Sequence, residues 1–170
     1  DHFALPTDAL AVAKRQGRLH RNFQGYSTQP DCDLVALGVS AIARMGSTYS
    51  QNAKTLPEYD EAVQQRRLPI VRGYALTADD LMRRDVIMAI MCQGRLDIGR
   101  IERAHGIRFD DAFANELRAL DGLAQAGLVT RTPGRIEVTV AGWFLVRAIA
   151  MVFDHHLQAA QERHRFSKVV

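Results

Sequence analysis

Short apolar and polar segments alternate along the first third of the chain, a pattern typical of strands joined by turns. The longest apolar run, residues 34–39, has the length and the β-branched content of a buried strand. Gly38 lies inside this run and indicates that another backbone or a ligand comes close. The other elements expected in this part are short helices over 5–17 and 55–66, an extended segment over 19–27 and a strand over 45–50.

Farther along the chain, apolar positions recur every three or four residues, which predicts helices. Phe113, Leu117 and Leu120 follow this spacing and predict a buried stripe. Two short segments, 128–131 and 135–138, surround a proline–glycine turn and predict a β-hairpin. The expected helices span 78–93, 97–106, 110–127 and 139–153.

This change of pattern divides the chain into three parts. Residues 1–67 form a β-containing piece that looks incomplete, and residues 68–76 are interpreted as a linker. Residues 77–170 form a mainly helical domain with its own core. Three short helices, a hairpin and a further helix give that domain a winged-helix-like outline. The predicted fold class is therefore α+β.

The composition is that of an ordinary globular protein, with 47% hydrophobic and 24% charged residues among 170. No apolar run is long enough to cross a bilayer, and no signal peptide is visible. A cytoplasmic location without membrane contact is therefore expected. Because the sequence begins with Asp1 rather than methionine, we expect it to be a fragment of a longer protein.

A winged-helix outline suggests DNA binding, with the third helix in the major groove. The net charge of +3 would permit an anionic partner. The charges on that helix argue against this role, because DNA phosphates repel an acidic surface. An interaction or packing domain is favoured, and no nucleic acid is expected as a partner. The charged residues of the helix are Asp110, Asp111, Glu116 and Asp121, against Arg118.

Candidate metal ligands are few. Cys32 and Cys92 fit no metal-binding spacing, and both are expected to be free thiols, with Cys92 buried on a helix. His155 and His156, with His164 farther along, could suggest a metal site. Adjacent helical residues point about 100° apart, so these two side chains are not expected to converge. The sequence predicts a solvated helix surface there and no metal site.

A segment that reads Arg-Asn-Phe-Gln-Gly-Tyr mixes basic, aromatic and amide side chains before the apolar run. We predict a pocket near Phe23, Gln24, Gly38 and Ile42, the alternative being a core strand beside an ordinary hairpin. His2 lies at the expected end of a strand and is a further pocket candidate, the alternative being a loop histidine bound by backbone. The sequence contains no recognisable nucleophile–base arrangement and no phosphate-binding loop.

Six segments distributed along the chain carry a resemblance. They are Asp-His-Phe-Ala at 1–4, Leu-His-Arg-Asn-Phe-Gln-Gly-Tyr at 19–26, Leu-Gly-Val-Ser-Ala-Ile at 37–42, Arg-Arg-Asp-Val-Ile at 83–87, Met-Val-Phe-Asp at 151–154 and Arg-Phe-Ser at 165–167. In this order they resemble the C-terminal part of the oxygen-independent coproporphyrinogen III oxidases, a radical S-adenosylmethionine family of haem biosynthesis. The element Asn-Phe-Gln-Gly-Tyr is the most specific of them.

The resemblance implies the last segment of a partial α/β, TIM-like barrel followed by the helical C-terminal domain. It implies S-adenosylmethionine and a [4Fe-4S] cluster as cofactors, an electron donor to the cluster, and a monomeric full-length enzyme. The implied reaction oxidatively decarboxylates two propionates of coproporphyrinogen III to vinyl groups and gives protoporphyrinogen IX. The family's Cys-x3-Cys-x2-Cys cluster motif is absent from this sequence. The fragment alone is therefore expected to be inactive.

The same resemblance assigns three site residues. Phe23 and Gln24 match the family's active-site pair, here taken as catalytic, and Ile42 matches a position that contacts S-adenosylmethionine. An apolar side chain can pack against the adenosyl group. An amide can bind cofactor or substrate without adding a competing acid or base.

Basic residues near this element suggest a role with the substrate. We expect Arg18, His20 and Arg21 to lie near the mouth of the site and to attract the substrate's four carboxylates, the alternative being a solvated charged face.

Two alternative functions remain at this point. One is a haem chaperone of the same superfamily, and the other is a winged-helix module that binds a protein or DNA.

Overall fold

The structure is a computed structural model that describes residues 4–157, so the predictions for His2, His164 and the two terminal segments lie outside the described residues. The chain begins with helix α1, Ala9–Arg15, which Asp8 caps by accepting from the backbone N–H of Leu10 at 2.8 Å. A two-stranded hairpin follows, with β1 at His20–Asn22 and β2 at Gly25–Ser27.

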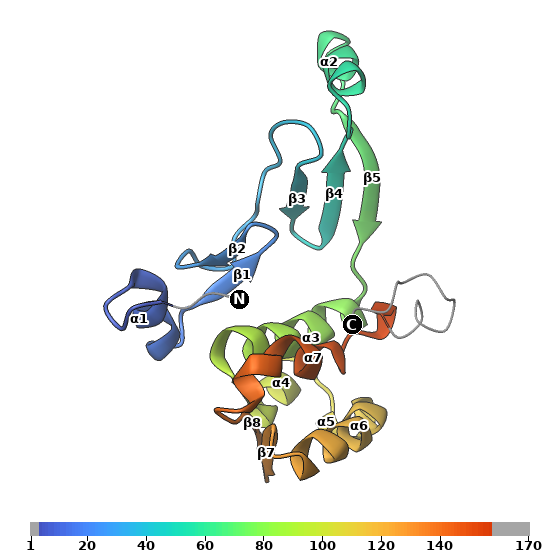
Figure 1. The fold of residues 1–170 in the computed structure, drawn as a ribbon. Helices are drawn as coiled ribbons and strands as arrows, with labels where there is room; N and C mark the ends of the chain where they lie inside the picture. Colours follow the sequence, from blue (N-terminus) through green and yellow to red (C-terminus); the bar gives the residue numbers. More distant parts are fainter. Residues whose placement is uncertain (1–3, 158–170) are drawn as a thin grey trace.

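A three-stranded antiparallel sheet stands above the hairpin and the helical part (Figure 1). It consists of β3, Ile42–Met45, then β4, Thr48–Asn52, then β5, Ile70–Ala75, in that order across the sheet. Helix α2, Leu56–Gln64, connects β4 to β5 at the far end. The interpretation of 68–76 as a linker is wrong in this respect, because β-branched and aromatic residues there pair with β4, for example Tyr74 with Tyr49.

The buried strand predicted at 34–39 is also wrong. Val35 and Leu37 are 66% and 83% exposed, and the run contributes a single bridge, between Leu34 and Arg44. The backbone turns at Gly38, whose φ is +95°, and the Asn52 amide donates to the carbonyl oxygen of Gly38 at 2.9 Å. The turn and this hydrogen bond direct the backbone away from the neighbouring strand, so residues 34–39 form no β-ladder. A Cβ at Gly38 would meet nothing within 4 Å, so the predicted close approach is absent from the described structure.

The helical part begins at a capping box in which Thr77 accepts from the backbone N–H of Asp80 and the Asp80 carboxylate accepts from that of Thr77. Helix α3 and a π-helical turn follow, and Gly94 ends them in the left-handed conformation. The elements are α3 at Ala78–Met88, the turn at Ala89–Gln93, β6 at Arg95–Asp97, α4 at Ile98–His105, α5 at Phe109–Ala112, α6 at Ala114–Gln125, β7 at Val129–Thr132, β8 at Arg135–Val138, a 3-10 helix at Gly142–Leu145 and α7 at Val146–Met151.

The predicted hairpin is confirmed as β7–β8, and β6 adds a third strand beside β8. Two predicted helices differ from the structure. The third is broken at Phe113, where φ is −120° and ψ is 28°, so Asp110 lies inside α5 rather than at a cap. The last predicted helix is divided into a 3-10 turn and the short α7.

The hydrophobic core lies almost wholly within residues 82–153. Phe109, Phe113 and Phe153 are fully buried, and their ring centroids lie 4.6–6.5 Å apart. The stripe of Phe113, Leu117 and Leu120 on α6 is confirmed as buried. By contrast, every residue of β5 is exposed. Among the described residues, no helix is both long and apolar enough to cross a bilayer.

Candidate functional site

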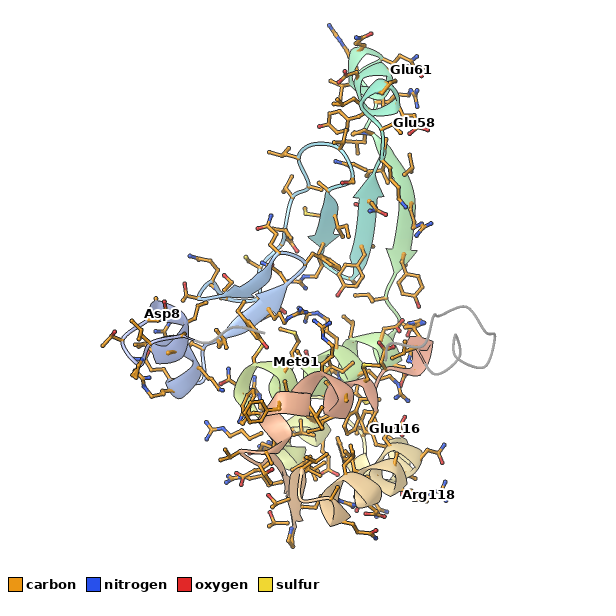
Figure 2. The ribbon with its side chains drawn as sticks, in the orientation of Figure 1. Asp8, Glu58, Glu61, Met91, Glu116 and Arg118 are labelled. Atoms are coloured by element: carbon orange, nitrogen blue, oxygen red, sulfur yellow. The ribbon has the colours of Figure 1, made fainter. Side chains whose placement is uncertain are left out.

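A cavity of about 500 Å³ lies where the β1–β2 hairpin, the lower end of the β4–β5 pair, helix α3 and the segment after α7 come together. Figure 2 shows the side chains that fill the region between these elements. The cavity therefore joins the two parts of the chain. The lining residues used below are His20, Arg21, Phe23, Asp31, Arg44, Tyr49, Tyr74, Asp80, Arg83, Arg84, His155 and His156.

Phe23 reaches the cavity from the turn of the hairpin. The turn is tight because the Asn22 carboxamide oxygen accepts from the backbone N–H of Gln24 at 2.8 Å and Gly25 has a φ of +127°. The Phe23 ring meets the Tyr49 ring edge to face, with centroids 5.2 Å apart, and remains 53% exposed. Phe23 thus presents an apolar surface to a ligand.

The other predicted site residues are not in the lining. Gln24 lies exposed in the turn, and Ile42 opens β3 opposite Gln51. Gly38 is likewise outside the cavity lining. The cofactor role of Ile42 and the catalytic role of Gln24 stay predictions.

Four arginines and three histidines line the cavity, and Asp31 neutralises part of the charge at the end that holds His20. The Asp31 carboxylate accepts from both terminal nitrogens of Arg84, at 2.8 and 2.9 Å, and from Arg44. His20 Nε2 lies 3.2 Å from the same carboxylate. Partial burial alone would raise the pKa of Asp31, but Arg84, Arg44 and His20 outweigh it and hold the pKa below its usual value. Burial lowers the pKa of His20, so this ring tends to be neutral.

Arg83 is also neutralised. Its guanidinium donates to Asp79 and to Glu116, each at 2.7 Å, and lies 5.2 Å from the centroid of the Phe113 ring. Glu116, which is buried on α6 and labelled in Figure 2, needs this partner. Arg83 is therefore a structural cation that ties α3 to α6.

Arg21 differs from its neighbours. It forms no ion pair among residues 4–157, and its Nε is buried without a hydrogen-bond partner there. The guanidinium lies 5.7 Å from the centroid of the Tyr26 ring. A buried N–H without a partner costs about 1–3 kcal/mol. Arg21 lines the cavity without an ion pair among residues 4–157, so it is the strongest candidate for anion binding. Arg18, by contrast, lies outside the lining and donates to Gln16.

At the other end of the cavity, His155 and His156 converge on Asp80, which corrects the prediction that they diverge. Their ring centroids are 4.0 Å apart, and their Nε2 atoms lie 3.6 and 2.6 Å from Asp80 Oδ1. The chain leaves α7 at Met151 and starts a new turn at Asp154, which caps Leu157. Both rings therefore lie beside Asp80 in the first turn of α3.

Asp31, Arg84 and Asp80 are functional candidates that sequence reasoning missed. Neither Asp31 nor Asp80 lies in a recognisable catalytic or metal-binding motif. The pair Arg83–Arg84 in the middle of α3 could have signalled an anion or a carboxylate partner. Nothing in the local sequence indicates which carboxylate Arg84 binds, because Asp31 is 53 residues away along the chain.

Comparison with known proteins shows which proteins this chain is similar to. Residues 76–145 match the family described as the HemN C-terminal domain. The chain is 48% identical over 170 residues to the oxygen-independent coproporphyrinogen III oxidase of Salmonella typhimurium, and 45% identical over 174 residues to that of Synechocystis, covering all of this chain and 37% of each relative.

A solved structure shows the same likeness. It is coproporphyrinogen III oxidase, HemN, from Escherichia coli, described as a radical SAM enzyme. The TM-score is 0.88 at 49% identity, over 92% of this chain and 36% of that one. The chain thus spans about a third of the length of the relatives it matches. Residues 76–145 match the HemN C-terminal domain, and the whole chain is similar to the C-terminal part of the oxygen-independent coproporphyrinogen III oxidases.

Proposed function

We propose that this chain is the C-terminal part of a radical S-adenosylmethionine oxidoreductase that oxidatively decarboxylates two propionates of coproporphyrinogen III. The proposal rests on the similarity of this whole chain to oxygen-independent coproporphyrinogen III oxidases, together with the TM-score of 0.88. The product would be protoporphyrinogen IX. An electron donor would serve the cluster, and the complete enzyme would act as a monomer.

The chain's own thiols do not fit a [4Fe-4S] cluster, which requires thiolate ligands held together. Cys32 is exposed, whereas Cys92 is buried, and burial raises the pKa of Cys92 to about 11. Cys92 is thus held as a protonated thiol. We therefore assign no cluster ligand to these residues. The role proposed for this chain is binding and positioning.

S-adenosylmethionine, when bound, supplies the radical that abstracts hydrogen from a propionate. The chain's contribution would be to hold the reactants and to exclude water. Phe23 offers an exposed aromatic face beside Tyr49, which suits packing against an adenosyl group or a pyrrole. We further propose Ile42 as a cofactor contact and Gln24 as an uncharged hydrogen-bonding group at the same site.

The substrate carries four carboxylates, and the cavity offers cations to receive them. Arg21 forms no ion pair among the described residues, whereas Arg83 and Arg84 are committed to carboxylates of the chain. We propose that Arg21 binds one propionate. A charge-assisted hydrogen bond of this kind would also fix the orientation of the macrocycle.

The proposal includes a finer description of the fold. The three-stranded sheet β3–β4–β5 would be part of the last segment of a partial α/β barrel. Its uncovered strand β5 and the exposed Val71 fit a surface that further barrel elements cover. Helices α3, α4 and α6 with the β6–β8–β7 sheet would form the winged-helix-like domain.

A chimeric enzyme tests the function. This chain would replace the aligned C-terminal part of the Escherichia coli relative, whose remaining part would supply the rest of the enzyme. The proposal predicts anaerobic conversion of coproporphyrinogen III to protoporphyrinogen IX when S-adenosylmethionine and a reductant are added. A folded chimera that cleaves S-adenosylmethionine but leaves the propionates intact would contradict the proposal.

A further inference from the structure

The geometry points to a divalent transition-metal site formed by Asp80, His155 and His156. We propose that it takes a borderline cation such as Zn²⁺ or Co²⁺, with two imidazole nitrogens and one carboxylate oxygen from the protein. The three donor atoms all lie within 4.8 Å of one another. This inference is independent of the proposed enzyme activity.

The distances suit tetrahedral coordination. A tetrahedral ion with ligands about 2.0 Å away holds them about 3.3 Å apart. The Nε2 atoms of His156 and His155 lie 2.6 and 3.6 Å from Asp80 Oδ1, on either side of that value. Small rotations of the two exposed or half-exposed rings would therefore complete the site. Water would occupy the fourth position.

The carboxylate is already oriented for this task. Asp80 is 6% exposed, and its Oδ2 accepts from the Thr77 backbone N–H and hydroxyl, both at 2.8 Å, and from the Tyr74 hydroxyl at 3.0 Å. These three donors occupy Oδ2 and leave Oδ1 for the histidines. Three hydrogen bonds to one oxygen favour the ionised form of the Asp80 carboxyl. Outer-shell partners of this kind fix the geometry of metal ligands.

The neighbouring charges allow a cation. Asp79 Oδ2 lies 3.5 Å from His155 Nδ1, and Glu116 is 2.7 Å from Arg83. Arg83 pairs with both of these carboxylates, so one positive charge faces two negative charges. The Asp80 carboxylate adds a third negative charge, which favours the binding of a divalent cation. Tyr74, whose hydroxyl is 3.3 Å from His156 Nε2, connects the site to β5. Metal binding would thus fasten the end of the helical part to the sheet.

Metal titration of the full chain tests the inference. Zn²⁺ affinity would be measured by competition with a chromophoric chelator, in a Cys32→Ser background that removes the exposed thiol. We expect one equivalent to bind, and His155→Ala and His156→Ala each to lower the affinity about tenfold or more, since loss of an outer-shell partner alone costs about 10–100-fold. Co²⁺ would give a visible spectrum of tetrahedral coordination that both variants lose.

The matched control is His105→Ala. His105 Nε2 lies 2.9 Å from Asp85, so this histidine also pairs with a carboxylate but has no second histidine beside it among the described residues. We expect His105→Ala to retain the metal, and circular dichroism would establish that each variant folds. The inference is overturned if the parent chain binds no Zn²⁺, or if either His155→Ala or His156→Ala binds as tightly as the parent.

Discussion

Asp31 and Arg84 join the two parts of the chain through a bidentate pair, in which both terminal nitrogens of Arg84 donate to the Asp31 carboxylate at 2.8 and 2.9 Å. Asp31 follows the β1–β2 hairpin, and Arg84 lies on α3. The planar fork of a guanidinium fixes the relative orientation of its partner. This pair therefore sets the distance between the element that carries Phe23 and the helical domain.

Replacing this carboxylate should loosen that connection. Asp31→Asn leaves Arg84, Arg44 and His20 without their shared anion. Because the Asp31 side chain is 41% exposed, we expect a modest loss of about 1 kcal/mol in the free energy of unfolding. Urea denaturation would measure it. Asp111→Asn is the control, since its pair with Arg108 is fully surface-exposed at 3.5 Å and should change stability by less than about 0.5 kcal/mol.

The same carboxylate predicts a pH dependence. The folded-state pKa of Asp31 lies below its usual value, so its stabilisation is fully present above the unfolded-state pKa of about 3.9. It is lost as the pH falls from there through the lowered pKa. As the pH falls below about 4, the parent should therefore lose stability more steeply than Asp31→Asn. Equal slopes for the two proteins would show that the carboxylate has no such role.

Alanine substitutions at two glycines with the same φ distinguish the cost of a steric clash from the cost of backbone strain. Gly94 and Gly106 both have a φ of +65°, but a Cβ at Gly94 would lie 2.2 Å from the Trp143 ring, whereas one at Gly106 meets nothing within 4 Å. We expect Gly106→Ala to cost about 1–2 kcal/mol through the left-handed conformation. Gly94→Ala should cost about 1–3 kcal/mol more. Thermal unfolding would measure both, and equal losses would show that Trp143 moves away freely.

The two thiols should differ in reactivity. Cys92 is 2% exposed with a pKa raised by burial to about 11, whereas Cys32 is exposed. At pH 8, iodoacetamide should modify Cys32 within minutes and leave Cys92 intact until urea unfolds the chain. Mass spectrometry of peptides would identify each site. Rapid labelling of Cys92 in the native chain would contradict the packing of the π-helical turn.

The helical part was largely predictable, whereas the arrangement of the first part was not. Helix caps such as Thr77 and Asp97, and the spacing of Phe113, Leu117 and Leu120, are local signals that tertiary packing reinforces. The prediction of a buried strand at 34–39 was wrong because apolar content alone cannot distinguish a buried strand from an exposed loop. Its burial depends on surfaces that the described residues do not supply.

In the candidate site, too, part of the arrangement was predictable from the sequence and part depends on long-range contacts. Phe23 was predicted to lie at a pocket, and it does line the cavity, but the resemblance rather than periodicity supplied its role. The convergence of His155 and His156 on Asp80 depends on where α7 ends, 71 residues after Asp80, and ideal helix geometry gave the opposite answer. Long-range contacts of this kind have no local signature.

The most direct measurement is the affinity of the chimeric enzyme for coproporphyrinogen III with and without the Arg21 guanidinium. In Arg21→Gln, we expect the KM for coproporphyrinogen III to rise about tenfold or more, because a charge-assisted hydrogen bond is worth about 1.5–3 kcal/mol. Arg108→Gln, an exposed surface arginine, should leave KM unchanged. An Arg21→Gln enzyme that folds and binds the substrate as tightly as its parent would contradict the assignment of this cavity to the substrate's carboxylates.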